Sequence, residues 1–357
     1  MTGAPVRSEL LPLPGRGEGP PVLTSNNPEV FTGDGLLYGN ARPSPERGGA
    51  AVRLEGVFGV YLHHLNRSGS TKYVAILVTN PNPGDVHVSL RGSGYSQTET
   101  GGLGLGTSPD YRVSREWILD SPETVVPSTA IAPSAGILLW QKRVNDTAEV
   151  DGRFGLTSDA PVFVYVVATS DGSLVAALTQ SRLDAPGDYR VSGNPPPPFG
   201  REAGVYAHDT WVAHFDVAAP AAPARISFMV NTATGGGLSQ VQAFPALGHY
   251  DSSAAESVGM YGNVYAFDVG ITNRGSGASR RVRVAFHSLA MGTASRWWDG
   301  VGLVDEVETV VRHVPGSVTT ELAEVALAAG ETRRLRFRAM VPGLAAIPQA
   351  LSIESLP

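Results

Sequence analysis

Two hydrophobic patterns recur along the chain, and both are typical of β-strands. Residues 72–79 carry apolar side chains at odd and even positions alike, which predicts a central strand of a β-sandwich with both faces covered. After the Asn-Pro-Asn-Pro-Gly turn at 80–84, Val86, Val88 and Leu90 alternate with polar residues. This alternation predicts a strand with one buried and one exposed face.

The rest of the first half continues in short elements. Residues 57–63 are expected to pair with 72–79 across the turn at 66–69, which gives a β-hairpin. Residues 111–119 favour a helix, inserted between strands. Later apolar runs predict further strands, at 137–140, 162–168 and 174–178.

The second half of the chain repeats the arrangement of the first. Residues 264–271 predict a strand and 272–275 a turn, after which valines and a phenylalanine alternate with arginines. Val78-Thr79-Asn80 corresponds to Ile271-Thr272-Asn273, and residues 131–134 correspond to 327–330. Two correspondences in the same order, at nearly the same offset, suggest two related β-sandwich domains.

Proline and glycine positions suggest where these domains begin and end. Residues 1–30 hold both at irregular spacing and predict an extended N-terminal tail. Four consecutive prolines favour polyproline II, so residues 194–200 are expected to form a linker. The prediction is an all-β fold of two tandem antiparallel β-sandwiches, Ig-like or jelly-roll-like, over 31–193 and 201–357.

Composition agrees with this fold and narrows the function. A length of 357 residues suits two domains, and 42 glycines with 27 prolines favour short strands joined by turns. The net charge of −6 disfavours nucleic acid as a partner, and the absence of cysteine excludes disulfides and thiolate chemistry. No apolar run predicts a membrane span, and no signal peptide is visible, so a secreted protein would have lost its signal.

Candidate chemistry is sparse. Asn145, Asp146 and Asp151 are oxygen-bearing residues around one turn and form a weak calcium candidate, with an ordinary Asx turn as the alternative. No other metal site and no cofactor are expected. No Gly-x-Ser-x-Gly motif occurs, and a hydrolase would need a spatial carboxylate pair, for which Asp299, Asp305 and Glu306 are loose candidates.

Trp297, Trp298 and Asp299 form the most distinctive short string. Adjacent indoles in a loop can offer flat faces to sugar rings or to a protein partner. The alternative is that one indole fills a sandwich core while the other packs at its rim.

Arginines alternate with apolar residues in two segments. Arg281, Arg283, Arg334, Arg336 and Arg338 would form a basic face if both segments lay in one sheet, and such a face can bind an anionic polymer or an acidic neighbour. The alternative is pairing across strands with acidic residues, namely Glu306, Glu308, Glu321 or Glu324.

Several short strings carry a resemblance that periodicity does not. They are Asn27-Pro28-Glu29-Val30, Gly33 with Gly35-Leu36-Leu37-Tyr38, residues 60–66, residues 74–80 and Tyr261-Gly262-Asn263-Val264-Tyr265. These strings resemble the uncharacterised β-rich region of secreted bacterial surface proteins, which often accompanies copper-amine-oxidase-like stalk domains. The resemblance implies an extracellular location and a structural or binding role. It supplies no catalytic residue.

The sequence therefore favours a non-catalytic, secreted or cell-surface structural protein that acts in adhesion, matrix, surface-layer or filament assembly. A carbohydrate-binding module is the alternative, and a glycan-active hydrolase is third. The expected partners are other copies of the chain or another surface protein, with a glycan under the alternative. The tail would either donate a strand to a neighbour's open sheet edge or pack on its own domain.

Overall fold

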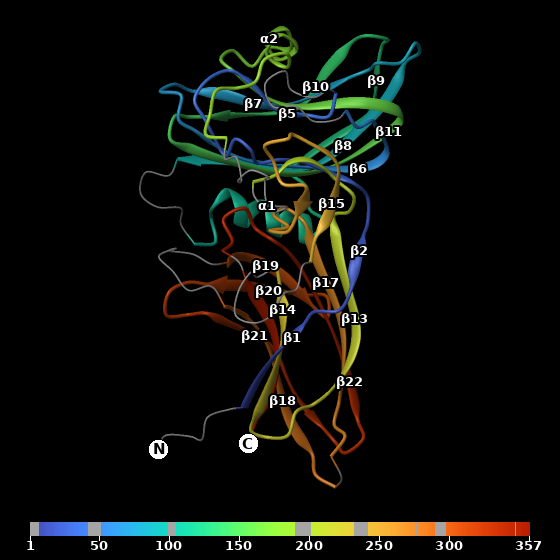
Figure 1. The fold of residues 1–357 in the computed structure, drawn as a ribbon, viewed down its shortest axis with the longest axis vertical. Helices are drawn as coiled ribbons and strands as arrows, with labels where there is room; N and C mark the ends of the chain where they lie inside the picture. The colour runs from blue at the N-terminus through green and yellow to red at the C-terminus, as the bar shows by residue number, and fades with distance from the viewer. Residues whose placement is uncertain are drawn as a thin grey trace. The chain divides into compact units, whose positions relative to one another are not determined.

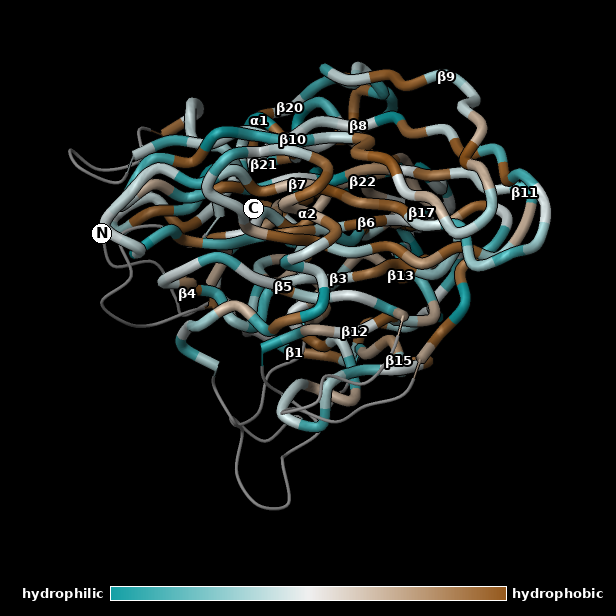
Figure 2. Tube along the Cα trace, turned by 90° about the horizontal axis from the view of Figure 1, so that it is seen from above, coloured by the Kyte–Doolittle hydropathy of each residue, from teal (hydrophilic) through white to brown (hydrophobic). Residues whose placement is uncertain are grey.

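The computed structural model describes residues 7–41, 51–98, 105–189, 201–231, 242–275, 277–289, 298–346 and 348–357. Strands dominate this part of the chain, with two short helices, which confirms the predicted all-β class (Figure 1). Brown, hydrophobic and teal, hydrophilic positions are interspersed along the strands (Figure 2). In β22 (Thr332–Met340), buried and exposed residues alternate from Leu335 to Ala339, as a sheet with one buried face requires.

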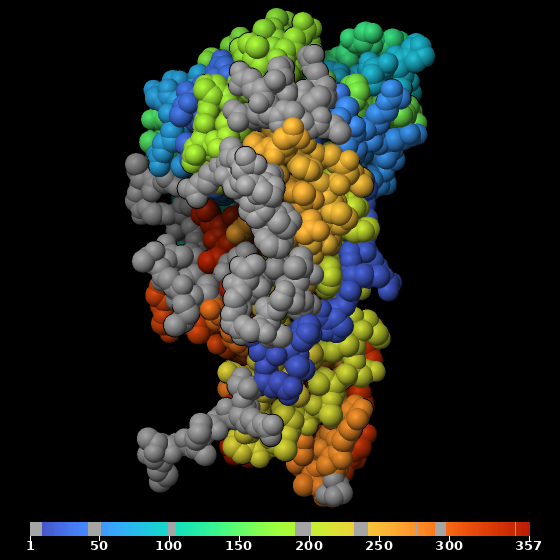
Figure 3. Space-filling model, in the orientation of Figure 1, coloured from blue at the N-terminus to red at the C-terminus, as the bar shows by residue number. Residues whose placement is uncertain are grey.

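The chain divides into two compact units whose boundaries differ from the predicted ones. Unit 1 comprises Met1–Glu18, Thr210–Ala243 and Val258–Pro357, and unit 2 comprises Gly19–Asp209 and Phe244–Ser257. Figure 3 shows the light orange atoms of the second segment lying among the blue and green atoms of unit 2. Unit 2 is thus inserted into unit 1 rather than following it. The predicted linker at 194–200 lies outside the described residues.

Unit 1 is built from two sheets, counted over the described residues. The five-stranded sheet contains, in order, β1 (Arg7–Pro12), β14 (Ala224–Val230), β23 (Gln349–Ser355), β18 (Arg280–Ser288) and β21 (Thr319–Leu327). The six-stranded sheet contains β2 (Arg16–Glu18), β13 (Thr210–Ala218), β17 (Val264–Thr272), β22, β19 (Trp298–Val304) and β20 (Val307–His313). Phe286 of the first sheet packs on Phe337 and Trp298 of the second, with ring centroids 5.6 and 5.1 Å apart. The two sheets therefore form a sandwich.

Unit 2 consists of one sheet that folds over to form two layers. Among the described residues this sheet has twelve strands, namely β3 (Val22–Ser25), β4 (Val30–Phe31), β5 (Gly35–Gly39), β6 (Leu54–Asn66), β7 (Lys72–Thr79), β8 (Val86–Thr98), β9 (Thr124–Ile131), β10 (Gly136–Val144), β11 (Ala148–Thr169), β12 (Ala203–Tyr206), β15 (Phe244–His249) and β16 (Glu256–Ser257). The long strand β11 pairs with β6 and β8 in its first half and with β5 and β7 in its second half. Both layers share one apolar core, which includes Val60 and Leu62 of β6 and Ile76 of β7.

The predicted extended tail is wrong for the part that the structure describes. β1 pairs with β14, β2 pairs with β13, and β3 lies between β6 and β12. Val22 and Leu23 are fully buried. Sheet hydrogen bonds and this burial offset the ordering entropy of the segment, about 1–2 kcal/mol per residue. The N-terminal strands therefore pack on their own chain, as the alternative expectation held.

Individual element predictions had mixed outcomes. The central strand at 72–79 coincides with β7, and the helix at 111–119 is α1 (Pro109–Ile118). The hairpin between 57–63 and 72–79 is wrong, because β6 and β7 pair with different halves of β11 and not with each other. The strand at 174–178 is also wrong. Ser173 caps a helix there, α2 (Leu174–Gln180), by accepting a hydrogen bond from the Ala176 N–H.

Asn80, just after β7, joins two turns by its side chain. Its Nδ2 donates to the carbonyl of Ile131 at 2.8 Å, and its Oδ1 accepts from the N–H of Asn82 at 2.8 Å. Its own carbonyl accepts from the N–H of Ser134 at 3.0 Å. We call this arrangement an asparagine clamp: a strand-end asparagine that bonds its own turn and the turn before another strand.

The same clamp recurs in unit 1, at the position that the repeat in the sequence predicts. Asn273 donates to the carbonyl of Leu327 at 3.1 Å and accepts from the N–H of Gly275 at 3.0 Å. Its carbonyl accepts from the N–H of Gly330 at 2.8 Å. Asn66, at the end of β6, makes a third set of such bonds. The repeated strings therefore mark one local structure that both units use.

Replacing a clamp asparagine is expected to destabilise the unit that holds it. Asn80→Ala or Asn273→Ala removes the donor to a buried strand-end carbonyl, and each should lower the free energy of unfolding by about 1–3 kcal/mol in urea denaturation. Asn145→Ala, at an exposed turn position, is the control and should change it by less than about 0.5 kcal/mol. Equal effects at all three positions would contradict a special role for the clamps.

Candidate functional site

The predicted aromatic loop does not present its second tryptophan to a ligand. Trp298 and Asp299 lie on β19 with no exposed surface, and Trp298 packs edge-on against Phe286. Asp299 accepts a hydrogen bond from Nε of Arg312 at 3.0 Å. Trp297 lies outside the described residues. Trp298 is thus a core residue, as the alternative interpretation held, because its indole fills the space between the two sheets of unit 1.

The five arginines do not form one basic face. Arg281 and Arg283 lie on β18 of the five-stranded sheet, whereas Arg334, Arg336 and Arg338 lie on β22 of the six-stranded sheet. The first group pairs with acidic residues on adjacent strands, as Arg281 does with Glu324 and Arg283 with Glu354. In the second group, Arg334 binds Asp268 and Asp216, each at 2.7 Å. The predicted basic face is wrong, and cross-strand pairing accounts for these contacts.

The calcium candidate is not assembled. Asp146 accepts from the N–H of Gly69 at 2.9 Å, and Asn145 accepts from the Thr71 hydroxyl at 3.2 Å. Asp151 is instead buried inside β11, beside His63. Across the described residues, no group of three His, Cys, Asp or Glu side chains is placed to hold a metal ion.

The loose carboxylate candidates lie at opposite ends of β19. Asp299 is near its start, whereas Asp305 and Glu306 form the turn that follows it. Asp305 accepts from the N–H of Arg336 at 2.9 Å and pairs with Arg333 at 3.2 Å. These carboxylates therefore serve the turn and the sheet, and they do not converge on one point.

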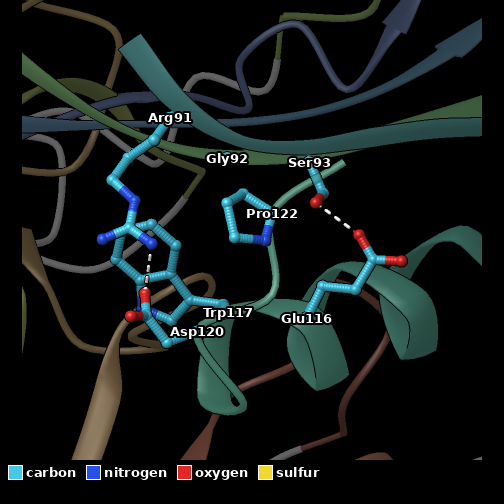
Figure 4. Close-up of a pocket in the computed structure, with 7 residues that line it drawn as sticks. All are labelled: Arg91, Gly92, Ser93, Glu116, Trp117, Asp120 and Pro122. Carbon is cyan, nitrogen blue, oxygen red and sulfur yellow. Dashed lines mark hydrogen bonds and ion pairs between the residues drawn. The ribbon is translucent and has the colours of Figure 1, made fainter. Parts of the chain in front are cut away.

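Unit 2 holds a small pocket where α1 meets β8. The space between its walls, open solvent included, is about 220 Å³, and seven residues line it (Figure 4): Arg91, Gly92 and Ser93 from β8, Glu116 and Trp117 from α1, and Asp120 and Pro122 from the segment that leads to β9. Arg91 and Asp120 form an ion pair at 2.6 Å with side chains 52% and 73% exposed, so this side of the pocket meets solvent.

The end of α1 fixes the position of Asp120. The N–H of Ser121 bonds to the carbonyl of Glu116 at 2.9 Å, and the N–H of Asp120 bonds to that of Trp117 at 3.3 Å. These two bonds form a Schellman motif, which places Asp120 in the left-handed region with φ 54°. Glycine usually occupies this position because other residues are strained there. Asp120 occupies this strained position, and its side chain pairs with Arg91.

Glu116 is held from the sheet side of the pocket. It accepts hydrogen bonds from the hydroxyls of Ser93 and Tyr95, the second at 2.6 Å. Burial and the hydrogen bond to Glu116 raise the pKa of Tyr95, so the phenol keeps its proton. The Arg112 guanidinium lies over the Tyr95 ring, 3.5 Å from its centre. These contacts fix α1 against β8.

Arg153 supports Trp117. Its guanidinium carbon lies 4.2 Å from the centre of the indole, and Nη2 contacts Oδ2 of Asp209 at 2.8 Å. Burial lowers the pKa of Arg153, and the nearby charge of Asp209 opposes that shift. Gly59 leaves room for this side chain, since a Cβ there would lie 2.1 Å from Nη1 of Arg153.

The same sheet face carries further buried polar groups beside Arg153. His63 Nδ1 and Asp151 Oδ1 face each other at 3.5 Å. Burial alone would lower the pKa of His63, but Asp151 and the negative charges of Glu149 and Glu29 outweigh it and raise the pKa to about 9. His63 is therefore a buried cation at neutral pH, and these groups serve the interior of unit 2.

The comparisons with known proteins identify a family model for part of the chain only. Residues 8–102 match a family described as a protein of unknown function (DUF3370). The match includes residues 8–30, which are most of the segment predicted as a tail from its prolines and glycines. No curated protein matches the chain. In the described residues no helix is long and apolar enough to cross a membrane.

Sequence reasoning placed Trp117 and Glu116 inside a helix but gave them no role. The available signal was a single tryptophan beside a glutamate on a short helix inserted between strands. Nothing in the sequence indicated that β8 would bring Arg91 and Ser93 to the same place.

Proposed function

We propose that this chain is a non-catalytic, secreted or cell-surface protein that acts in adhesion by binding carbohydrate in the pocket of unit 2. The observation that carries the proposal is the partly buried indole of Trp117, which lines the pocket beside the Arg91–Asp120 ion pair. A flat aromatic surface beside charged hydrogen-bonding groups suits a sugar ring, which has apolar C–H faces and a rim of hydroxyls.

The pocket residues are held in place before any ligand arrives. Arg153 supports the indole, Ser93 and Tyr95 hold Glu116, and the Schellman motif sets Asp120. A site that is already ordered loses less conformational entropy on binding. This arrangement supports a binding role.

The surface location in this proposal follows from the resemblance to secreted bacterial surface proteins. Assembly by donation of the N-terminal strands is not part of it, because β1, β2 and β3 already pair within the chain.

Two variants of the pocket test the proposal. Trp117→Ala should reduce the affinity for a glycan selected on an array at least tenfold, measured by isothermal titration calorimetry, and Trp117→Phe should retain part of it. Asp120→Gly removes the partner of Arg91 while placing the preferred residue in the left-handed position. It should weaken binding several-fold without lowering the melting temperature.

A third variant, Arg91→Gln, tests the ion pair of the pocket, and Arg281→Gln is its matched control. Both arginines are exposed and paired with one carboxylate, in different units. Only Arg91→Gln should weaken binding. The proposal fails if the wild-type protein binds no glycan on the array, or if Trp117→Ala binds as the wild type does.

A further inference from the structure

The pocket opens onto an exposed part of the sheet, which we call the open sheet face. It is formed by Ser89 and Arg91 of β8, Gly155 and Thr157 of β11, Val57 of β6 and Val125 of β9. Cross-strand register places Gly155 opposite Arg91 and Thr157 opposite Ser89. A Cβ on Gly155 would lie 3.6 Å from the Trp117 ring, so this face begins at the indole.

The opposite side of these strands is the core, which shows that the open sheet face is the outer one. Phe154, Leu156 and Leu90 alternate with the residues named above and are buried in the core of unit 2. On the outer side, Arg91 and Thr157 are exposed, whereas Gly155 and Ser89 are partly buried. Because the side chains of Gly155, Ser89 and Thr157 are short, a shallow strip of the sheet runs between Trp117 and His87, near the start of β8.

Ionisable groups lie at the two ends of this strip. Arg91 pairs with Asp120 at the pocket end, and His87 pairs with Asp159 at 2.9 Å at the other end. Between them lie hydroxyls and glycine. The Asp159 carboxylate at one end, and the Asp120 carboxylate already paired with Arg91 at the other, disfavour an acidic polymer, which favours a neutral ligand.

The apolar residues of the face are too scattered for the core of a protein interface. Val57 is 60% exposed and Val125 is 67% exposed, and strands β11 and β8 with Gly155, Thr157 and Ser89 lie between them. Protein interfaces have a contiguous apolar and aromatic centre with a polar rim. A row of hydroxyls that ends at one indole suits a polyhydroxylated chain better.

We propose that the ligand is a linear neutral polysaccharide, with one ring against Trp117 and the following rings along the strip toward His87 and Asp159. This inference rests on the proposed carbohydrate-binding function. From Ser93 to His87 the strand rises by about 20 Å, at about 3.4 Å per residue. That length accommodates several rings in a row, so affinity depends on chain length.

The test has two parts. Affinity gel electrophoresis should show retardation by neutral glucomannan, xyloglucan or mixed-linkage glucan, and none by alginate or polygalacturonate. Calorimetry with oligosaccharides of the retarding polymer should show affinity that rises at least tenfold from two to five units. Thr157→Arg, which fills the strip from an exposed position, should abolish this rise and leave disaccharide binding unchanged. Thr319→Arg, at an exposed strand position of unit 1, is the matched control and should bind as the wild type does.

The outcomes separate this inference from the function on which it rests. The inference is overturned if the affinity is equal for oligosaccharides of two and five units. It is also overturned if Thr157→Arg keeps the chain-length dependence of the wild type. Either result counts even where Trp117→Ala abolishes binding. Preference for the acidic polymers, or capture of a peptide rather than a glycan by the strip, overturns it as well. If the wild-type protein binds no glycan, both proposals are overturned.

Discussion

Arg153→Met is expected to lower the free energy of unfolding of unit 2 by about 3–5 kcal/mol. The substitution removes the guanidinium that lies 2.8 Å from the carboxylate of Asp209, whose side chain is 11% exposed. Removing one member of a buried ion pair leaves an uncompensated charge, which is more costly than losing the pair's attraction. The loss of the contact with Trp117 adds to this effect. Denaturation in urea, followed by tryptophan fluorescence, measures the change.

A double substitution separates the unpaired charge from other causes. Arg153→Met combined with Asp209→Leu removes both charges and should recover much of the lost stability, because apolar replacement of a buried pair is often neutral. Arg281→Met is the control, since that arginine is 60% exposed and pairs on the surface, and it should cost less than about 1 kcal/mol. If the double variant is no more stable than Arg153→Met, the packing of Arg153 and not its charge stabilises unit 2.

Unit 2 is expected to lose stability as the pH rises from about 5 to about 8, and Glu202→Gln is expected to remove most of this loss. Complete burial raises the pKa of Glu202 to about 8, against the partial opposition of a hydrogen bond from Ser257. A carboxyl whose pKa is raised on folding contributes stability below its unfolded pKa and loses it as the pH rises through the folded one. At about 1.4 kcal/mol per pKa unit, Glu202→Gln should stabilise unit 2 by about 3 kcal/mol at pH 7.

His63 acts in the same direction over a higher range. Its folded pKa of about 9 means that its contribution is present below about pH 6.5 and is lost as the pH rises through 9. Glu202→Gln should therefore flatten the stability profile between about pH 5 and 6.5 and leave the fall caused by His63 between about pH 6.5 and 9. Glu55→Gln, at an exposed position of the same unit, is the control for the loss of one charge. A Glu202→Gln profile parallel to that of the wild type would show that Glu202 ionises normally in the fold.

The pattern of polar and apolar residues predicted an element correctly where both of its faces have the same surroundings, or where its structure depends on short-range contacts. β7 was predicted because both of its faces are apolar, which only a covered strand tolerates. The asparagine clamps were visible as repeated strings, because each clamp reaches only its own turn and one other turn. α1 was predicted, and its capping serine and end motif are contained in fourteen consecutive residues, 108–121.

The pattern failed where several strands compete for the same partner. Residues 57–63 and 72–79 have the turn of a hairpin between them, yet β6 and β7 pair with separate halves of β11. A strand of 22 residues that bends between two layers offers more paired backbone than a local hairpin does. The prediction that the arginines of β18 and β22 form one basic face was wrong for a related reason. Alternation fixes which side of a strand a residue lies on, but not which sheet the strand joins.

The sequence by itself determined the all-β class, the positions of several strands and the repeated turns of this protein, because these depend on side-chain alternation and on short-range hydrogen bonds. Only the tertiary structure decided that residues 7–25 complete both units, that Trp298 belongs to a core and that Trp117 lines a pocket. The physical reason is that burial and site formation depend on pairing between strands far apart in the chain. That pairing brings Arg91, Trp117 and Arg153 together although no local pattern connects them.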